Sequence, residues 1–235
     1  ACFMSATSSF VKKHGIDFCC NGDKSLSEAC NESKVNKKMI LQEIRMLDEK
    51  KSETYFNTMD LNVLINHILD THHNYVKESL PVILEFAIKV SEVHGIKNPE
   101  TIEIAKLFNL LTIELKQHML KEEEILFPHI RDLVMENKNL KQISFPSDSV
   151  KKPIKIMKKE HHRAGFFIKK IKELSTNFTP PSSTCNTHKS LYYHLKEFKD
   201  DLDIHIHLEN NILFPKAIEL EKRNKLLSLN QILKY

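Results

Sequence analysis

Hydrophobic and polar positions recur along most of the chain with the period of an α-helix. Leu69, His73, Val76 and Leu80, for example, fall on one side of a helix. Long segments of this kind, joined by short or medium connections, predict an all-α fold, an antiparallel four-helix bundle. The segments cover residues 60–95, 98 to about 127, about 149–174 and about 188–214.

Proline and glycine mark the expected ends of these helices. Gly95 follows the first helix, and Pro99 is a first-turn proline for the second. Pro81 predicts a kink inside the first helix, because proline removes a backbone hydrogen bond. Pro128 and Pro215 predict a kink or a stop at the ends of the second and fourth helices.

The chain ahead of the bundle looks like a separate small unit. It holds four of the five cysteines and ends in a polar stretch at residues 50–59. Short helices are expected at residues 8–14, from Ser25 or Ser27, and from Asn31 onward. We therefore expect three parts: a small helical cysteine-pair domain at residues 1–55, the bundle at residues 56–222, and a helical tail at residues 223–235.

Composition narrows the class of protein. Only four glycines and no tryptophan argue against a β-rich fold with many turns. The net charge of +4 comes from scattered lysines, so we expect no nucleic-acid partner. No apolar run is long enough to span a membrane, and the first residues lack the layout of a signal peptide. An odd number of cysteines suits a reducing compartment, so we expect a cytoplasmic protein.

Thirteen histidines are roughly twice what average composition provides, and a repeat accounts for several of them. The pattern H-x-x-x-E-x-x-I-L-F-P occurs at residues 118–128 and again at residues 205–215. His73 and His161 precede the two copies at nearly equal distances. Each half of the bundle is therefore predicted to be a helix with a histidine followed by a helix with His-x-x-x-Glu.

The spacing of the repeat indicates a metal site. Side chains at positions i and i+4 lie on the same helix face, and buried carboxylates are costly without a cation. Imidazole and carboxylate together suit iron, manganese or catalytic zinc, and the lack of cysteine disfavours structural zinc. Six ligands fit two ions, with each glutamate bridging, two histidines on each ion and an oxo or hydroxo bridge as a fifth ligand, which leaves one position per ion vacant if each ion is six-coordinate. The predicted ligands are His73, His118, Glu122, His161, His205 and Glu209.

Some positions around the site stay open. His72 and His162 adjoin predicted ligands and could replace them, although the apolar stripe and the matched offset favour His73 and His161. Glu114 and Glu160 could orient an imidazole, or could be ordinary solvated acids. Other histidines are interpreted as surface or supporting residues: His67, His94 and His207.

The sequence resembles the repair-of-iron-centres (RIC) family over about residues 8–220. The stretches IDFCCNG, THHNYVKESLP, HMLKEEEILFP, KEHHRAG and DDLDIHIHLENNILFP carry the resemblance, the first to a cysteine-pair N-terminal domain and the others to a hemerythrin-like HHE domain. The resemblance implies two non-haem iron ions, oxo- or hydroxo-bridged. It implies four terminal histidine ligands and two bridging glutamates, which are the same six residues: His73, His118, His161, His205, Glu122 and Glu209.

The resemblance also implies a stress-response function, the repair of iron–sulfur clusters damaged by nitric oxide or oxidants. We expect the chain to donate iron or to handle NO, as an iron donor more than as an enzyme. The alternatives are a hemerythrin-like carrier or sensor of O2 or NO, and a di-iron NO reductase. The expected partners are damaged iron–sulfur proteins with NO or O2 as small ligands, and neither nucleic acid nor membrane; a homodimer is left open.

Two adjacent cysteines are candidates for a chemical role. Cys19 and Cys20 follow Ile-Asp-Phe and precede a turn, so their thiols could receive iron or NO, or contact a protein with a damaged cluster. Small buried packing residues are the alternative. Cys30 is a weaker third candidate.

Overall fold

A computed structural model describes residues 25–40, 54–137, 149–182 and 184–232. Within these ranges every regular element is helical, which confirms the predicted all-α class. The elements ahead of the bundle are α2 (Leu26–Glu32) and α4 (Thr54–Thr58). Those of the bundle are α5 (Leu61–His67), η1 (Ile68–His73), α6 (Asn74–His94), α7 (Glu100–Lys121), η2 (Glu122–Leu126), α8 (Phe127–Asn137), α9 (Lys151–Leu174), α10 (Asn186–His207), η3 (Leu208–Leu213) and α11 (Phe214–Ile232).

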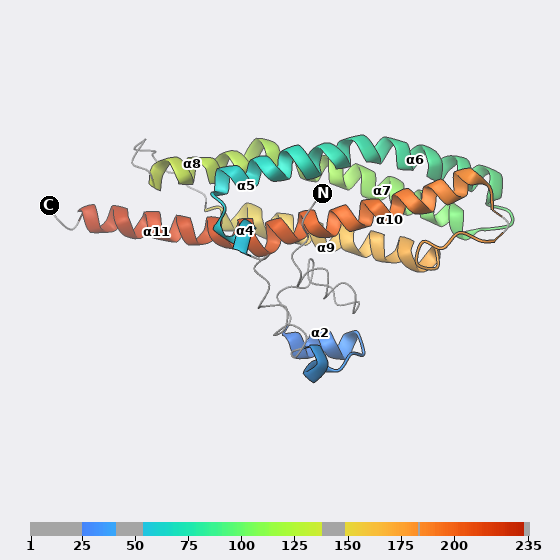
Figure 1. The fold of residues 1–235 in the computed structure, drawn as a ribbon. Helices are drawn as coiled ribbons and strands as arrows, with labels where there is room; N and C mark the ends of the chain where they lie inside the picture. The colour runs from blue at the N-terminus through green and yellow to red at the C-terminus, as the bar shows by residue number, and fades with distance from the viewer. Residues whose placement is uncertain (1–24, 41–53, 138–148, 183, 233–235) are drawn as a thin grey trace.

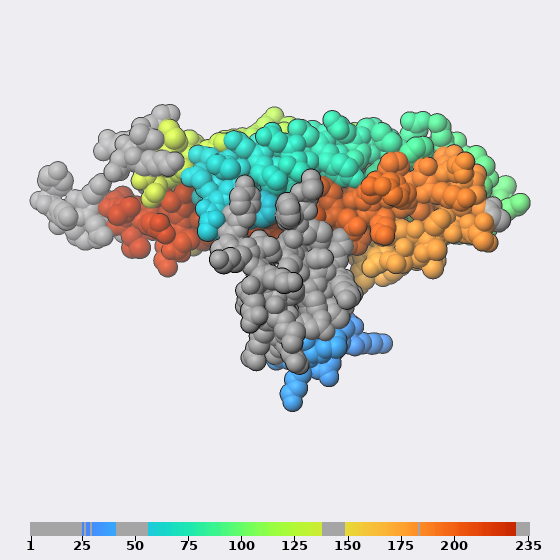
Figure 2. All heavy atoms as spheres, viewed as in Figure 1, coloured from blue at the N-terminus to red at the C-terminus, as the bar shows by residue number. Residues whose placement is uncertain are grey.

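The bundle consists of four rods, and Figure 1 shows them side by side. The first rod is α5–η1–α6, the second α7–η2–α8, the third α9, and the fourth α10–η3–α11. Helix α6 packs against α7 and α10, and α7 also packs against α9. In Figure 2 the atoms of α5 and α6 lie along those of α10 and α11. The predicted four-helix bundle is confirmed.

The rod ends follow from local chemistry. Asp60 caps the first rod, where its side chain accepts a hydrogen bond from the N–H of Asn62 at 2.8 Å. Gly95 ends the same rod as predicted. A Cβ atom at this glycine would lie 2.9 Å from Cγ1 of Ile102 and still closer to the Ser91 carbonyl oxygen, so only glycine lets this turn approach α7 so closely.

The rods do not stop at Pro128 and Pro215, so of the predicted kink or stop the stop is wrong. Pro128 and Pro215 are the second residues of α8 and α11, which continue to Asn137 and Ile232. Each proline lies just after a π-helical segment, where the register of backbone hydrogen bonds changes. Helix α6 likewise continues through Pro81.

Three π-helical segments interrupt the described rods instead. In η2 the N–H of Phe127 bonds to the carbonyl of Glu122, five residues back, and in η3 the N–H of Phe214 bonds to the carbonyl of Glu209 in the same way. The N–H of Asn74 closes η1 by bonding to Leu69. The repeated letters E-x-x-I-L-F therefore encode a wide turn in both copies. Such turns occur frequently at functional sites.

The residues ahead of the bundle are described only in part. A second helix was expected near Ser25, and α2 begins there with a capping box: Ser25 N–H bonds to the Glu28 carboxylate at 2.8 Å. The next helix does not start at Asn31 as predicted, because the chain turns at Lys34 with a left-handed φ of 54° and resumes helix only after Asn36. The predicted helix at residues 8–14 lies outside the described residues, as do Cys19 and Cys20.

Two apolar cores fill the bundle, one on each side of a polar level. One core includes Leu115, Met119 and Ile206, and the other includes Phe127, Met157, Leu208 and their neighbours. Asn224 donates a hydrogen bond to the Leu133 carbonyl at 2.9 Å, so α11 also contacts α8.

None of the helices in the described ranges combines the length and apolarity that crossing a membrane requires.

Candidate metal centre

The six side chains predicted as ligands meet at the polar level between the two cores. They form two groups, and within each group one ligand atom per residue lies within 4.8 Å of the others. Both glutamates belong to both groups. The His118/His161 group consists of His118, His161, Glu122 and Glu209, and the His73/His205 group consists of His73, His205, Glu122 and Glu209.

The rods position these residues through the repeat. His118 and Glu122 lie one turn apart where α7 passes into η2, and His205 and Glu209 occupy the corresponding places on the fourth rod. The third rod supplies His161 without a π-turn. Because the wide turn begins at or beside each glutamate, the apolar residues that follow rejoin the core while the carboxylate stays at the polar level.

The His118/His161 group brings imidazole nitrogens into direct opposition. Nε2 of His118 lies 3.0 Å from Nε2 of His161. His118 Nε2 is also 3.2 Å from Oε2 of Glu122, and His161 Nε2 is 3.1 Å from Oε2 of Glu209. Two nitrogen lone pairs at this separation repel unless a proton or a cation lies between them. The group therefore favours positive charge at its centre.

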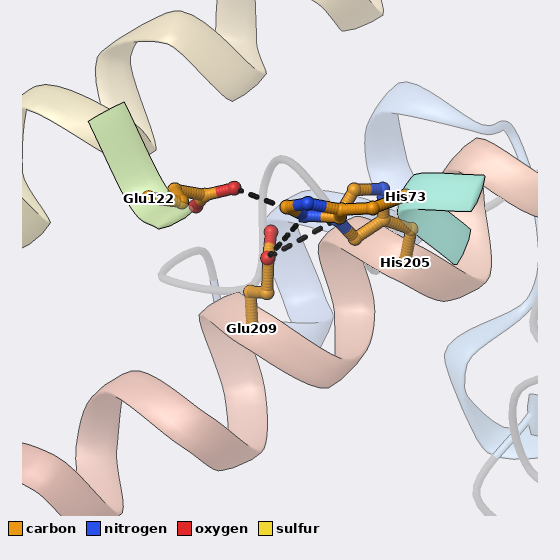
Figure 3. Close-up of side chains that lie close together, drawn as sticks. All are labelled: His73, Glu122, His205 and Glu209. Atoms are coloured by element: carbon orange, nitrogen blue, oxygen red, sulfur yellow. Dashed lines mark hydrogen bonds and ion pairs between the residues drawn. The ribbon is translucent and has the colours of Figure 1, made fainter. Parts of the chain in front are cut away.

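The His73/His205 group, shown in Figure 3, also consists of two histidines and two glutamates, but some of its nitrogen–oxygen distances are longer. His205 Nε2 lies 3.1 Å from Oε1 of Glu209, the glutamate one turn further on. His73 Nε2 lies 3.4 Å from Oε2 of Glu122 and 4.0 Å from Oε1 of Glu209. Carboxylates from two rods thus face imidazoles from two rods, and one carboxylate oxygen of Glu209 lies near both rings.

Burial makes this arrangement expensive without a cation. Each of the six residues is at most 3% exposed. Among the described residues, both carboxylate oxygens of Glu122 lack a hydrogen-bond partner, as do Oε2 of Glu209 and Nε2 of His73. Unpaired buried polar atoms are rare and cost free energy, since water no longer solvates them. A bound cation would satisfy all of these atoms together.

Charge within the site shifts the titration of its groups. Burial lowers the pKa of His118, but Glu122 outweighs it and, with Glu160 and Glu209, raises that pKa to about 10. At His205, burial also lowers the pKa, but the negative charge of Glu209 outweighs it, so the pKa of His205 is raised on balance. Burial raises the pKa of Glu209, yet His205 and His161 bring it well below its usual value. The carboxylates are therefore ionised, and the site attracts positive charge from protons or from metal ions.

Of the two acidic residues suspected of orienting an imidazole, the structure places only one beside a predicted ligand. Nδ1 of His118 lies 3.0 Å from Oε2 of Glu160, and the Glu160 carboxylate also pairs with Lys121. Glu114 instead pairs with Arg163 on the surface. The hydrogen bond from His118 first, and then the one from Lys121, lowers the pKa of Glu160 to about 2.

Two further orienting residues were missed in the sequence. His73 Nδ1 lies 2.7 Å from Oε1 of Glu123, and His161 Nδ1 lies 2.9 Å from Oδ1 of Asn210. Both partners directly follow the glutamate of the repeat, and in both copies that position carries a side-chain oxygen. Comparing the two copies letter by letter would have revealed them. Such contacts fix the ring and raise its basicity as a ligand.

His205 is held in a different way. Its Nδ1 is buried and has no hydrogen-bond partner within the described ranges. The ring of His72 stacks on it, with centroids 5.5 Å apart and an interplanar angle of 11°. His72 in turn bonds through Nδ1 to Oδ1 of Asp201 at 2.8 Å. His72 is thus buried beside the site but outside both groups, and His162 is exposed.

The donor set fits a pair of transition-metal ions. Four imidazole nitrogens and two carboxylates are ligands that iron, manganese or catalytic zinc accept. Two shared carboxylates and two pairs of histidines offer ligands for up to two ions. Neither group contains cysteine, unlike most structural zinc sites.

Comparison with known proteins finds similarity over most of the chain. The family model described as "Hemerythrin HHE cation binding domain" matches residues 64–217, and the ScdA_N model, a domain of unknown function, matches residues 1–48. The "Iron-sulfur cluster repair protein YtfE" of Citrobacter koseri is 35% identical over 211 residues, 90% of each chain. The protein of that name from Escherichia coli O8 gives the same values. A "Probable iron-sulfur cluster repair protein" of Haemophilus influenzae is 36% identical over 210 residues, 88% of this chain and 89% of that one.

Proposed function

The chain belongs to the family of hemerythrin HHE cation-binding proteins, and on this premise we propose that it repairs damaged iron–sulfur clusters with a pair of iron ions held by the six buried side chains. The likeness over nearly the whole chain carries the proposal. Relatives that share 35% of their residues over 90% of both chains are named for cluster repair. The segment ahead of the bundle matches a second domain, so the likeness is not confined to the bundle.

The proposed roles of the residues follow the two groups. His73 and His205 would hold one ion, His118 and His161 the other, and Glu122 and Glu209 would contact both. Iron, when bound, supplies the metal that a cluster requires and one-electron redox chemistry. The protein excludes water, because the six side chains are buried, and it orients three of the four rings through Glu160, Asn210 and Glu123.

The composition of the site supports release of iron as well as binding. Two carboxylates neutralise only part of the charge on two divalent ions, whereas ferritin-like di-iron sites have four carboxylates. The His205 ring moreover lacks the acceptor that the other three rings have among the described residues. Both features weaken retention of the ions, as a donor of iron requires.

The experiment that tests the proposal follows the metal itself. The full chain, loaded with isotopically labelled iron, is mixed with a cluster-free iron–sulfur protein, sulfide and a reductant. We expect the label to appear in the rebuilt cluster and the acceptor to regain activity. A Glu122→Ala/Glu209→Ala chain serves as the matched control. Labelled iron that stays on the bundle, or equal rebuilding by the control chain, would contradict donation.

Two other outcomes of the same experiment identify the alternative functions. A hemerythrin-like carrier or sensor would keep its iron and bind O2 or NO reversibly. A di-iron NO reductase would consume NO over many turnovers with a reductant. Gas uptake and product formation, measured on the same loaded sample, separate these outcomes from iron transfer.

We propose that the two adjacent cysteines act at the step in which iron passes to the acceptor protein. Cys19 and Cys20 lie within the segment that matches the ScdA_N domain. If their thiols accept iron or contact the damaged protein, Cys19→Ala/Cys20→Ala leaves the iron content unchanged but reduces delivery to the acceptor. Unchanged delivery would remove the cysteines from the proposal and leave the metal centre in place.

A further inference from the structure

A second cluster of reactive side chains lies at the other end of the bundle from the metal centre. There α6 ends at His94 and α10 begins after Cys185. Nε2 of His94 lies 3.1 Å from Sγ of Cys185. Cys185 is exposed, so its sulfur can meet molecules in solution. About twenty residues of α10 separate it from His205, a distance of about 30 Å at the rise of an α-helix.

The start of helix α10 favours a negative charge on this sulfur. Cys185 occupies the N-cap position with extended backbone, φ −72° and ψ 166°. The sulfur therefore lies beside the first turn of α10, where a helix N-terminus carries partial positive charge. The N–H of His188, followed by the His94 ring, lowers the pKa of the Cys185 thiol, whereas burial of the sulfur is slight and opposes them weakly.

A buried histidine beside this pair provides an independent indication of a ligand. His188 is 0% exposed, and neither of its ring nitrogens has a hydrogen-bond partner among the described residues. Its ring centroid lies 5.4 Å from that of His94, and the edge of Tyr192 covers it from the helix side at 4.6 Å. A buried imidazole without a partner costs free energy, which a polar group entering beside His94 would relieve.

We propose that Cys185, which is hydrogen-bonded to His94, exchanges with small disulfides in solution. His94 accepts the proton of the Cys185 thiol as the sulfur attacks one sulfur of the disulfide, and a new S–S bond forms while the old one breaks. The departing thiolate takes that proton from His94 and leaves as a thiol. The product is a mixed disulfide on Cys185, with no net oxidation beyond that carried by the small disulfide.

Two features fit exchange with a disulfide from solution. The exposed sulfur of Cys185 is accessible to such a disulfide, and Cys30, the other cysteine in the described residues, is buried and so is not positioned to displace the mixed disulfide. The cluster is not among the groups of side chains whose ligand atoms converge closely enough for a metal ion. The pair thus provides a reversible mark of disulfide stress, independent of the iron centre.

The test measures modification of Cys185 in the full chain, with and without iron. The protein is exposed to oxidised glutathione at neutral pH, digested with trypsin, and the peptide of residues 173–189 is quantified by mass spectrometry. We expect a mixed disulfide at Cys185 and a rate that falls about tenfold in His94→Gln, because the thiol loses the imidazole that accepts its proton. His129→Gln, a substitution on α8, serves as the matched control and keeps the original rate.

A measurement on the unaltered chain guards against a variant that fails to fold. Iodoacetamide should alkylate Cys185 faster in the folded protein than in urea at the same pH, because only the folded chain places His94 and the helix terminus beside the sulfur. Faster alkylation in urea would overturn the proposal, and so would an unchanged rate in a folded His94→Gln chain. Hydrogen peroxide that gives sulfenic acid at Cys185 faster than glutathione gives the mixed disulfide would overturn the choice of oxidant.

Discussion

The two candidate groups at the polar level use equivalent positions of the repeat and support their histidines differently. The residue before His161 is Glu160, whose carboxylate oxygen accepts from His118. The residue before His73 is His72, which offers the face of a ring to His205. One position of the repeat therefore supplies a hydrogen-bond acceptor to one group and a stacked ring to the other.

This difference indicates that the repeat determines where the ligands lie, whereas the residues behind the rings determine how tightly they bind a metal ion. Both groups bring two imidazoles and two carboxylates together, yet within the described part of the chain only the His118/His161 group has an oxygen acceptor behind each ring. An acceptor fixes the ring and increases its basicity, and loss of one reduces metal affinity by about 10–100-fold in other sites. Under the proposed function, the His73/His205 group should release its ion first.

The largest effect is expected at a carboxylate that both groups share, because its loss affects both groups. Glu209→Ala removes oxygens that face His205 and His161, so the iron content should fall from about two ions to nearly none per chain. Elemental analysis measures this, and circular dichroism shows whether the bundle still forms. His162→Ala, at the exposed neighbour of His161, is the control and should retain its iron. Full iron in a folded Glu209→Ala chain would refute the shared role.

Removing one histidine from each group should sharpen the comparison. His205→Ala is expected to leave about one ion, because the better supported His118/His161 group remains. His118→Ala should leave less than one, because only the weaker group survives. Iron content after passage over a chelating column distinguishes the two chains. Equal retention would mean that the outer contacts do not set the order of release.

A smaller change tests the acceptor alone. Glu160→Gln keeps the shape of the side chain but removes its negative charge, so iron in the His118/His161 group should be held about tenfold less tightly. Competition with a coloured chelator gives the affinity. Glu114→Gln is the matched control, since Glu114 lies one turn before His118 and pairs only with Arg163 among the contacts described. The comparison fails if both variants weaken binding equally.

The smallest effect is expected at the stacked ring. His72→Phe keeps an aromatic face against His205 and should change the rate of iron release less than about threefold, whereas His72→Ala should speed release more, since aromatic pairs contribute about 1 kcal/mol. Stopped-flow release to a chelator resolves the two rates. If Phe and Ala behave alike, the nitrogens of His72 or its bond to Asp201 matter more than the stack.

The sequence predicted which side chains come together because the paired histidine and glutamate of each repeat are close together along the chain. His118 with Glu122, and His205 with Glu209, are fixed by a spacing of one helical turn. Apolar periodicity predicted the four rods for the same reason. The contact between Glu160 and His118 joins two rods, and the sequence could offer Glu160 only as one of two candidates.

What the sequence did not reveal depends on geometry that periodicity does not resolve. A π-turn differs from an α-turn by one residue, so apolar spacing over a short window does not distinguish them. The helices consequently run past Pro128 and Pro215, where a stop was a reasonable expectation. The contacts of Glu123, Asn210 and Asp201 cross between rods, and they require knowledge of which faces meet.

The wide turns also bear on how an ion could leave a closed bundle. They occur at one level on three rods, and there the ladder of backbone hydrogen bonds shifts register between two separately packed cores. Breathing confined to this level would expose the ligands while both cores keep their packing. The amides of Glu122–Leu126 and Leu208–Leu213 should then exchange with solvent sooner than those of the flanking helices, which makes the middle of the molecule its natural exit.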